Sequence, residues 1–194
     1  MAPAAHPSSY SLPGVNMIQP ATQGDYDGLC GLYCIINAVR LVLTPHRDLS
    51  REEVKALFAE GVRFLARKGD LPKAVHSCVG ERVWPRLAER IVASAQPIAD
   101  RPILLERPRW AREVSVRETL LRIEKMIVAG KAPCVFLRGN YRHYSVISGY
   151  TSVSLKLFDS FGYRWVRRRS CGTTGTPARL HRLHVQSLIA LTAP

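Results

Sequence analysis

The sequence predicts an α+β fold in which helices come first along the chain and strands follow. Up to about residue 130, apolar residues recur at helical spacing together with helix-capping signals, whereas residues 131–194 break into short segments rich in β-branched and aromatic residues. No internal repeat and no long linker divides the two parts. We therefore expect a single domain over residues 19–194, with a helical lobe over about 19–130 and a β lobe over about 131–194. An interface between two lobes is a common place for a cleft.

The first 18 residues contain prolines and glycines among Ala and Ser and show no periodicity. We interpret residues 1–18 as a flexible N-terminal segment or as an arm draped over the domain, without chemistry of its own. They lack the basic start and the apolar stretch of a secretory signal.

A nearly continuous apolar run over residues 29–43 predicts a buried central helix that is too short to cross a membrane. Asp27 is placed to cap its start. Ser50 and Glu53 form a capping box for a second helix, which is expected to end near Lys68.

A further helix is expected over residues 81–95, where Pro85 is early enough to be tolerated in the first turn. Ser115 and Glu118 repeat the capping-box pattern before an amphipathic stretch that ends at Gly130.

The remaining segments favour strands. A short strand is expected over residues 102–106, before the last helix. After Gly130, five segments are separated by Gly, Asn and Ser, as a meandering antiparallel sheet requires. They span residues 133–139, 143–150, 152–160, 163–168 and 181–192.

The charge is unusual, because 28 Lys and Arg against 15 Asp and Glu give a net charge of +13. Such a balance suggests nucleic acid, acidic lipid or an acidic substrate. The arginines are scattered from Arg40 to Arg182, and the sequence has neither a glycine-rich phosphate loop nor an aromatic stacking platform. Nucleic acid is therefore an unfavoured partner. No segment approaches the roughly 20 apolar residues of a membrane span, so we expect a soluble protein.

The cysteines indicate a reducing compartment. An odd number of them in a chain of this length, without a secretory signal, favours the cytoplasm over a disulfide-bonded setting. They are Cys30, Cys34, Cys78, Cys134 and Cys171. His181 and His184 form an HxxH pattern, but in a strand residues three apart face opposite ways. We expect neither a metal site nor a cofactor.

Cys30 stands where a glycine-containing turn enters the central helix. Its sulfur would lie near unpaired backbone amides and the positive end of the helix dipole, which favours the thiolate. The dipole contributes only about 0.3–1 kcal/mol, so a strongly activated nucleophile also needs an imidazole nearby. Cys34, one helical turn later, is expected to be a core residue.

His143 opens one expected strand and Asp159 closes the next. If their hairpin is centred on Thr151, the two residues lie directly opposite one another on one face, with Cβ atoms roughly 4.5–5.5 Å apart. Asp159 would then orient the imidazole of His143. The same face would carry an apolar floor formed by Ile147, Val153, Leu155 and Leu157. Trp165, on the following strand, would either shield the pair from water or pack in the core.

The string QGDYDGLCGLYCIINA, followed far downstream by HYSVISGY and LFDS, resembles the papain-like cysteine peptidases, and most closely the bacteriocin-processing branch that cleaves double-glycine leaders. The resemblance implies a papain-like fold, with the nucleophile helix packed on an antiparallel sheet. It further implies that Cys30 is the nucleophile, His143 the general base and acid, and Asp159 the orienting residue. By the same analogy, Gln23 forms the oxyanion hole with the backbone amide of Cys30.

The sequence departs from this family in two respects. Gln23 precedes Cys30 by seven positions, one more than the family pattern, so the loop must bulge or another donor must serve, for which Gln19 is a poorer choice. The branch is usually a domain of a membrane transporter, whereas this chain has no transmembrane segment. The leader substrate therefore does not carry over.

The expected function is that of a cysteine peptidase that cleaves peptide or isopeptide bonds. An acyltransferase with the same triad is one alternative, and a non-catalytic basic module that binds nucleic acid or an acidic partner is another. The expected partner is a protein or peptide substrate. Because Arg142 is next to His143 and Arg167–Arg169 follow the strand of Asp159, we expect a preference for acidic or carboxylate-bearing substrates.

Overall fold

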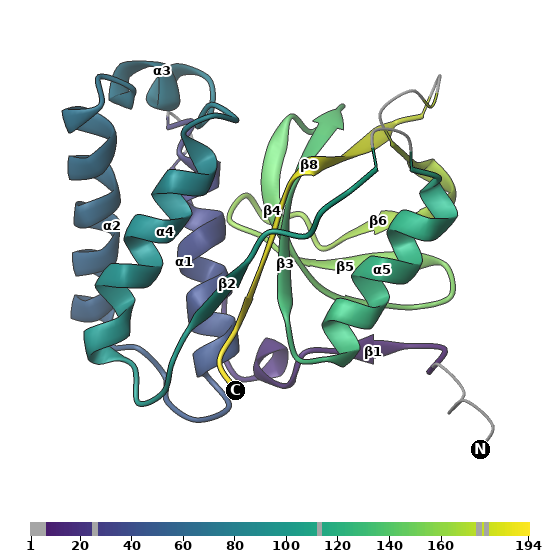
Figure 1. The fold of residues 1–194 in the computed structure, drawn as a ribbon, viewed down its shortest axis with the longest axis horizontal. Coiled ribbons are helices and arrows are strands. Elements are labelled where there is room, and N and C mark those ends of the chain that lie inside the picture. Colours follow the sequence, from purple (N-terminus) through teal and green to yellow (C-terminus); the bar gives the residue numbers. More distant parts are fainter. Residues whose placement is uncertain (1–6, 25–26, 112–113, 174–175, 177–178) are drawn as a thin grey trace.

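The computed structural model describes residues 7–24, 27–111, 114–173, 176 and 179–194. These residues form an α+β arrangement of helices and a largely antiparallel sheet, as the sequence predicts (Figure 1). Among them, no helix is both long enough and apolar enough to cross a membrane.

In the part of the chain that the structure describes, four α-helices form the N-terminal lobe. They are α1 (Cys30–Leu43), α2 (Arg51–Arg67), α3 (Leu71–His76) and α4 (Trp84–Ala95). The capping box of α2 is present in full, because Ser50 accepts from the Glu53 N–H and the Glu53 carboxylate accepts from the Ser50 N–H. The short helix α3 was not anticipated from the sequence. It has a single turn and a half, too short for a periodic signal.

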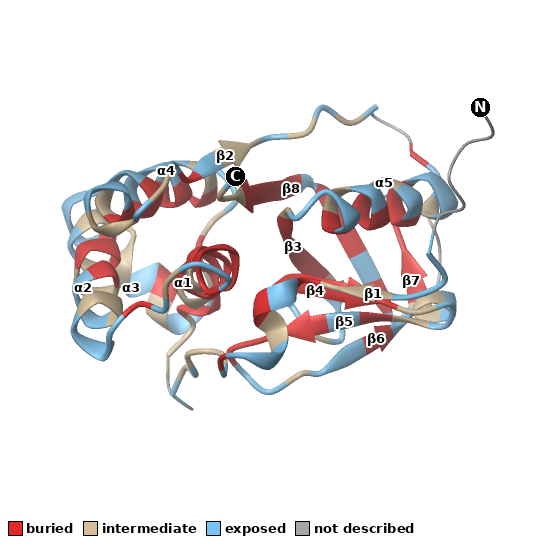
Figure 2. Cartoon of the chain, turned by 90° about the horizontal axis from the view of Figure 1, so that it is seen from below, coloured by how far each residue is buried: buried red, intermediate tan, exposed pale blue. Residues whose placement is uncertain are grey.

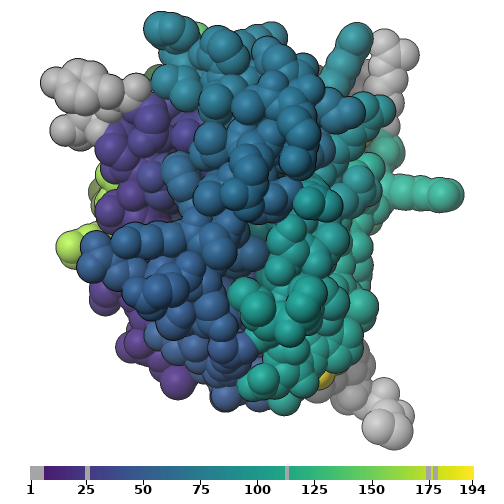
Figure 3. All heavy atoms as spheres, turned by 90° about the vertical axis from the view of Figure 1, so that its left-hand side faces the viewer, coloured from purple at the N-terminus to yellow at the C-terminus, as the bar shows by residue number. Residues whose placement is uncertain are grey.

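Helix α1 is the core of the molecule. Every residue of α1 except Tyr33 and Arg40 is buried, as the apolar run predicts (Figure 2). It contacts α2 and α4 on one side and β3, β4 and β8 on the other, so it lies between the helices and the sheet (Figure 1). The outer side of this lobe is made mainly by the segment that holds α2 to α4 (Figure 3).

Within the described residues, the sheet has eight strands. They are β1 (Tyr10–Ser11), β2 (Leu104–Glu106), β3 (Ala132–Gly139), β4 (His143–Tyr150), β5 (Ser154–Phe158), β6 (Trp165–Arg167), β7 (Cys171–Gly172) and β8 (His181–Thr192). The main order is β2-β8-β3-β4-β5-β6, while β1 pairs with β4 and β7 pairs with β8. The meander is therefore confirmed for β3 to β6 only. Strand β8 returns to the free side of β3, which local sequence signals do not encode.

Helix α5 (Val116–Val128) lies between β2 and β3 in the sequence and packs on β1, β3 and β4. Ser115 accepts a hydrogen bond from the Glu118 N–H, which is one half of the capping box that the sequence predicts. The helix is followed by Gly130, whose φ of +74° is the left-handed conformation that favours glycine after a helix.

The N-terminal segment lies along the sheet over residues 7–18. Tyr10 and Ser11 pair with the end of β4, and the Leu12 N–H donates to the Ser148 carbonyl at 2.8 Å. Leu12 is 3% exposed. Strand β3 pairs with β4 only as far as Val146, so the rest of that edge is open to this arm. Of the two interpretations of this segment, the draped arm fits residues 7–18 and the flexible segment does not, while residues 1–6 lie outside the described residues.

Candidate active site

Cys30 is the first residue of α1 and is 3% exposed. The loop before it is fastened to the same helix, because the buried Asn37 side chain exchanges two hydrogen bonds with the backbone of Ala21, at 2.7 and 3.1 Å. The N-cap residue is Leu29 and no side chain caps the helix, so the predicted capping role of Asp27 is wrong; Asp27 instead accepts from the Leu29 N–H at 3.0 Å in the preceding turn. The thiol is therefore held at a defined helix start.

Two glycines allow α3 and its following loop to approach the nucleophile. The Gly28 N–H donates to the Val75 carbonyl at 2.7 Å, and a Cβ at Gly28 would stand 2.5 Å from the Ala74 carbonyl oxygen. At Gly31 a Cβ would lie 3.0 Å from Val79. This close packing is the physical reason for glycine on either side of Cys30.

His143 and Asp159 meet as the sequence predicts. Nε2 of His143 lies 2.9 Å from Oδ2 of Asp159, and both side chains are buried. The second carboxylate oxygen, Oδ1, accepts from the backbone N–H groups of Phe161 at 2.8 Å and Tyr163 at 3.2 Å. Asp159 is therefore fixed by the turn after β5 and holds the imidazole in one orientation.

The expected register of this hairpin is wrong. Val146 pairs with Phe158, and continuing that register places Asp159 beside Ser145, not beside His143. The hairpin closes around residues 151–153 with Tyr150 opposite Leu155, and β4 carries an extra residue between Ile147 and Gly149. The contact between His143 and Asp159 is consequently a diagonal one on the same face.

The apolar floor expected on this face is only partly present. Ile147, Leu155 and Leu157 are buried, but Val153 is 69% exposed. Val153 belongs to the turn between β4 and β5, because the hairpin is centred further along the chain than expected.

Burial alone would lower the pKa of the His143 imidazole, but hydrogen bonding to Asp159 and to Cys30, together with their negative charges, raises it to about 9. Since Nε2 faces Asp159, the nitrogen that remains for the thiol is Nδ1. At neutral pH the imidazole is thus held as imidazolium between a carboxylate and a sulfur. This is the arrangement by which an imidazole activates a cysteine.

Gln23 lies between the nucleophile loop and the end of β5. Its amide Nε2 donates to the Asp27 carbonyl at 3.3 Å, and its Oε1 accepts from the Ser160 hydroxyl at 3.1 Å. Its backbone N–H also donates to the Ser160 carbonyl at 3.0 Å. The Gln23 side chain therefore connects Ser160, the residue after Asp159, to Asp27 in the loop that precedes Cys30. Residues 25–26 of this loop lie outside the described residues. The backbone carbonyl of Gln19, the poorer candidate, accepts a hydrogen bond from the Arg40 side chain.

An aromatic side chain that the sequence analysis did not single out packs on the imidazole. The ring of Tyr163 meets that of His143 edge-on, with centroids 5.5 Å apart and an interplanar angle of 88°. Tyr141 stacks on Tyr163 at 4.0 Å. The backbone bond from Tyr163 to Asp159 sets this position. Trp165 is 52% exposed and belongs neither to the core nor to a shield over the pair. The ring of Tyr163, rather than that of Trp165, covers the imidazole of His143.

A groove of about 590 Å³ adjoins Cys30 between the segment after α3 and the ends of β3 and β4. Its lining includes Cys78, whose thiol pKa is raised by burial and by the charge of Cys30. It also includes Tyr144, whose pKa burial raises, with further contributions from Cys78 and Cys30. Val79, another lining residue, packs against Gly31, the residue after Cys30, so the groove opens next to the nucleophile.

The second half of the expected basic wall lies elsewhere. Arg167, Arg168 and Arg169 line a separate pocket of about 610 Å³ with Val153 and Trp165. Strand β6 pairs with Ser154–Lys156, at the end of β5 away from Asp159. Arg167–Arg169 follow Asp159 closely in the sequence, but β6 runs back along β5 and so places them at the opposite end of that strand. The expected basic wall beside His143 is therefore wrong for these three arginines.

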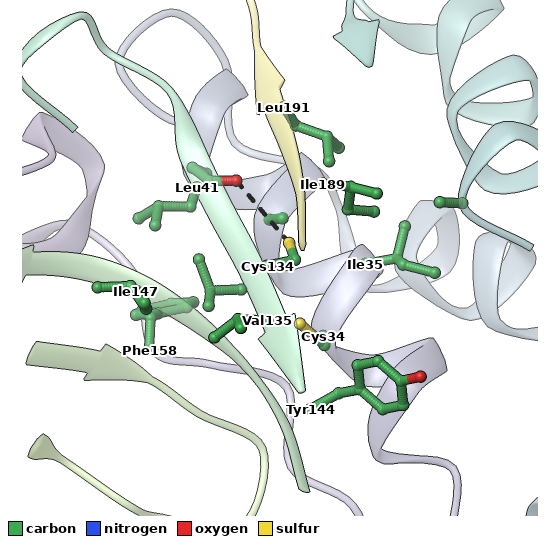
Figure 4. Close-up of a cluster of buried hydrophobic side chains, with 14 of the residues drawn as sticks. Cys34, Ile35, Leu41, Cys134, Val135, Tyr144, Ile147, Phe158, Ile189 and Leu191 are labelled. Atoms are coloured by element: carbon green, nitrogen blue, oxygen red, sulfur yellow. Dashed lines mark hydrogen bonds between the residues drawn. The ribbon is translucent and has the colours of Figure 1, made fainter. Parts of the chain in front are cut away.

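Cys34 packs in the core, where it lies near Cys134 among apolar side chains (Figure 4). Burial and the neighbouring Cys134 raise the pKa of its thiol well above the ordinary value, which disfavours a nucleophilic role. His181 and His184 are both buried. Within the described residues, no three His, Cys, Asp or Glu side chains are grouped as metal ligands.

The site that the structure assembles thus contains all four residues expected from the sequence: Cys30, His143, Asp159 and Gln23. No protein-family model and no curated protein matches the chain.

Proposed function

We propose that this protein is a papain-like cysteine peptidase that hydrolyses peptide or isopeptide bonds. The observation that carries the proposal is the imidazole of His143, held 2.9 Å from a buried carboxylate and in contact with the thiol at the start of α1. The resemblance of the nucleophile, histidine and aspartate blocks to that peptidase family supports the same conclusion, as does the packing of α1 against β3, β4 and β8.

In the proposed reaction, the Cys30 thiolate attacks the substrate carbonyl carbon and forms a C–S bond. The carbonyl oxygen becomes an oxyanion, which the Cys30 backbone N–H and the Gln23 amide are placed to stabilise. The His143 imidazolium then protonates the leaving amine as the C–N bond breaks. Neutral His143 takes a proton from water, which attacks the thioester and releases the acid and the thiolate.

Asp159 and Gln23 have different tasks in this scheme. Asp159 accepts from Nε2 and keeps Nδ1 directed at the sulfur, which stabilises the imidazolium. Gln23 donates one amide hydrogen to the Asp27 carbonyl and has a second one to offer an oxyanion.

The test is labelling by a thiol-directed covalent peptidase inhibitor, followed by mass spectrometry of the intact chain and its fragments. We expect one label, on Cys30, and loss of labelling in Cys30→Ala and in His143→Ala. Cys34→Ala is the matched control, one helical turn along, and keeps the label. Full labelling of Cys30→Ala would refute the assignment, provided that circular dichroism shows all variants folded.

Unlabelled protein with a free Cys30 thiol then decides how the acyl-enzyme is resolved. A peptide library digested with and without a primary amine acceptor distinguishes hydrolysis from acyl transfer, because an acyltransferase diverts product to the amine. The peptidase proposal expects free carboxylate as the main product at both conditions. Salt-dependent retention of RNA or DNA by a chain that neither labels nor turns over would instead favour a binding module.

A further inference from the structure

The groove beside Cys30 has a charged lining. Its lining includes Lys73, Cys78, Glu81, Arg138, Arg142 and Tyr144. Three of these side chains are cationic, and Glu81 is anionic. Lys73 comes from α3, Arg138 from β3 and Arg142 from the residue before β4. Three separate elements therefore each contribute a cationic side chain to the groove.

One of the three cations is already neutralised. Arg138 forms an ion pair with Glu81, and Nε2 of His184 lies 3.8 Å from the same carboxylate. Lys73 and Arg142 form no ion pair within the described part of the chain, and both side chains are exposed. The groove therefore keeps two uncompensated positive charges, which favours an anionic occupant.

These two charges lie close to the nucleophile. The pKa of Cys78 is raised by burial and by Cys30, and the charges of Arg142 and Lys73 oppose that rise. The packing agrees, because Val79 of the groove lining lies against Gly31, the residue after Cys30, and Arg142 directly precedes His143. A ligand group held by the cations would stand next to the bond that Cys30 attacks.

The backbone at Arg142 is held in a rare conformation. Its φ of +46° is the only positive value at a non-glycine residue among those described, and Arg142 directly precedes His143. A long side chain in the left-handed region is strained, and such strain concentrates at functional sites. Here the conformation belongs to the turn from β3 to β4, which brings Arg142 to the groove directly before His143 in the chain.

The groove also contains a hydrogen-bonding group without a partner. The Tyr144 ring is 1% exposed and stacks on Trp84 at a centroid distance of 4.1 Å. Its hydroxyl is buried and has no hydrogen-bond partner within the described residues. An unpaired buried hydroxyl costs free energy, unless a ligand completes it.

We propose that this groove binds a carboxylate of the substrate next to the scissile bond, through the charges of Lys73 and Arg142 and a hydrogen bond from the Tyr144 hydroxyl. The inference rests on the peptidase function proposed above and names its substrate class, which is peptides with a carboxylate beside the cleaved bond. Such a carboxylate belongs either to an Asp or Glu side chain or to the C-terminus of the chain.

Two small alkylating reagents test the proposal without a known substrate. Iodoacetate carries a carboxylate and iodoacetamide is its neutral counterpart, and each forms a C–S bond at a reactive cysteine with loss of iodide. The rates at Cys30 are measured by mass spectrometry with fragmentation, so that Cys34 and Cys78 are read separately. The observable is the ratio of the iodoacetate rate to the iodoacetamide rate.

The groove variant combines Lys73→Gln with Arg142→Asn, since asparagine tolerates a positive φ. We expect its rate ratio to fall at least about fivefold, as the loss of two charged partners implies. The control combines Arg167→Gln with Arg169→Gln, which removes the same charge at the pocket beyond β6, and keeps the parental ratio. Raising the salt concentration should reduce the parental ratio and leave that of the groove variant nearly constant.

An unchanged ratio in the groove variant, or an equal fall in the control, would overturn the carboxylate site while the peptidase proposal stands. If neither reagent modifies Cys30 in the parent protein, the peptidase proposal fails and the site falls with it. Two peptide arms then identify the source of the carboxylate: internal Glu with an amidated C-terminus, and internal Gln with a free C-terminus. Cleavage of only one series assigns the source, and equal cleavage of a series with neither carboxylate contradicts the proposal.

Discussion

Nε2 of His143 lies 2.9 Å from Oδ2 of Asp159, although the two residues are not cross-strand partners. The bond is possible because Asp159 follows the end of β5, where the backbone N–H groups of Phe161 and Tyr163 hold its other oxygen. Both oxygens of this buried carboxylate accept hydrogen bonds, so its orientation is fixed. The imidazole bonded to it is therefore held in one orientation as well.

Replacing the Asp159 carboxylate is expected to impair the orientation and charge of the His143 imidazole while the protein still folds. Asp159→Asn keeps an oxygen acceptor for the two backbone N–H groups but loses the charge that stabilises the imidazolium. We expect a loss of peptidase activity of about 10²- to 10⁴-fold, as for orienting carboxylates in catalytic triads. An NMR titration should find the pKa of His143 lowered in this variant. Parental activity together with an unshifted titration would contradict the role.

The pH dependence of folding follows from the raised pKa of His143. The folded-state value of about 9 exceeds the ordinary value of 6.5, so the protonated form is favoured by folding. Its contribution to the free energy of unfolding, at most about 3 kcal/mol, is fully present below pH 6.5 and is lost as the pH rises through 9. Urea unfolding across this window should show a decline that is smaller in His143→Gln. Peptidase activity should fall over the same upper range, because His143 loses the proton that the leaving amine requires.

Gly28→Ala should disable the nucleophile loop. The new methyl group would stand 2.5 Å from the Ala74 carbonyl oxygen, and a backbone atom cannot move aside cheaply. We expect a loss of about 1–3 kcal/mol in the free energy of unfolding, together with slower labelling of Cys30. Gly80→Ala is the control, because a Cβ there has open space within 4 Å. Equal behaviour of the two variants would show that the contact with α3 does not position Cys30.

Tyr144→Phe should leave stability unchanged or raise it. The hydroxyl it removes is buried and unpartnered within the described residues, so its loss relieves a desolvation cost. Trp84→Phe is the contrasting change in the same ring stack, because the Trp84 indole N–H donates to the Ser187 carbonyl at 2.8 Å. That variant should lose about 1–3 kcal/mol, from the unpaired carbonyl and the smaller ring. Thermal denaturation of both variants measures the difference, and a large loss in Tyr144→Phe would mean that its hydroxyl is satisfied within the protein.

Local signals in the sequence were sufficient for most of the elements. The Ser50 and Ser115 caps place α2 and α5, and the string from His143 to Tyr150 is the whole of β4. Helix α3 was missed because one and a half turns carry no period. The predicted hairpin register is wrong because the turn lies further along the chain, with Tyr150 opposite Leu155, and the extra residue between Ile147 and Gly149 then shifts the pairing by one position.

By itself, the sequence determined that a cysteine begins a buried helix and that a histidine and an aspartate face the same way on neighbouring strands. These features depend on capping, on apolar periodicity and on the two-residue repeat of strands, which act over a few residues. Only the tertiary structure decided which side chains surround them: Tyr163 against the imidazole, Lys73 and Arg142 in the groove, and Arg167–Arg169 at a different pocket. Those placements depend on how α3, β3 and β6 pack, and packing joins residues that no local pattern relates.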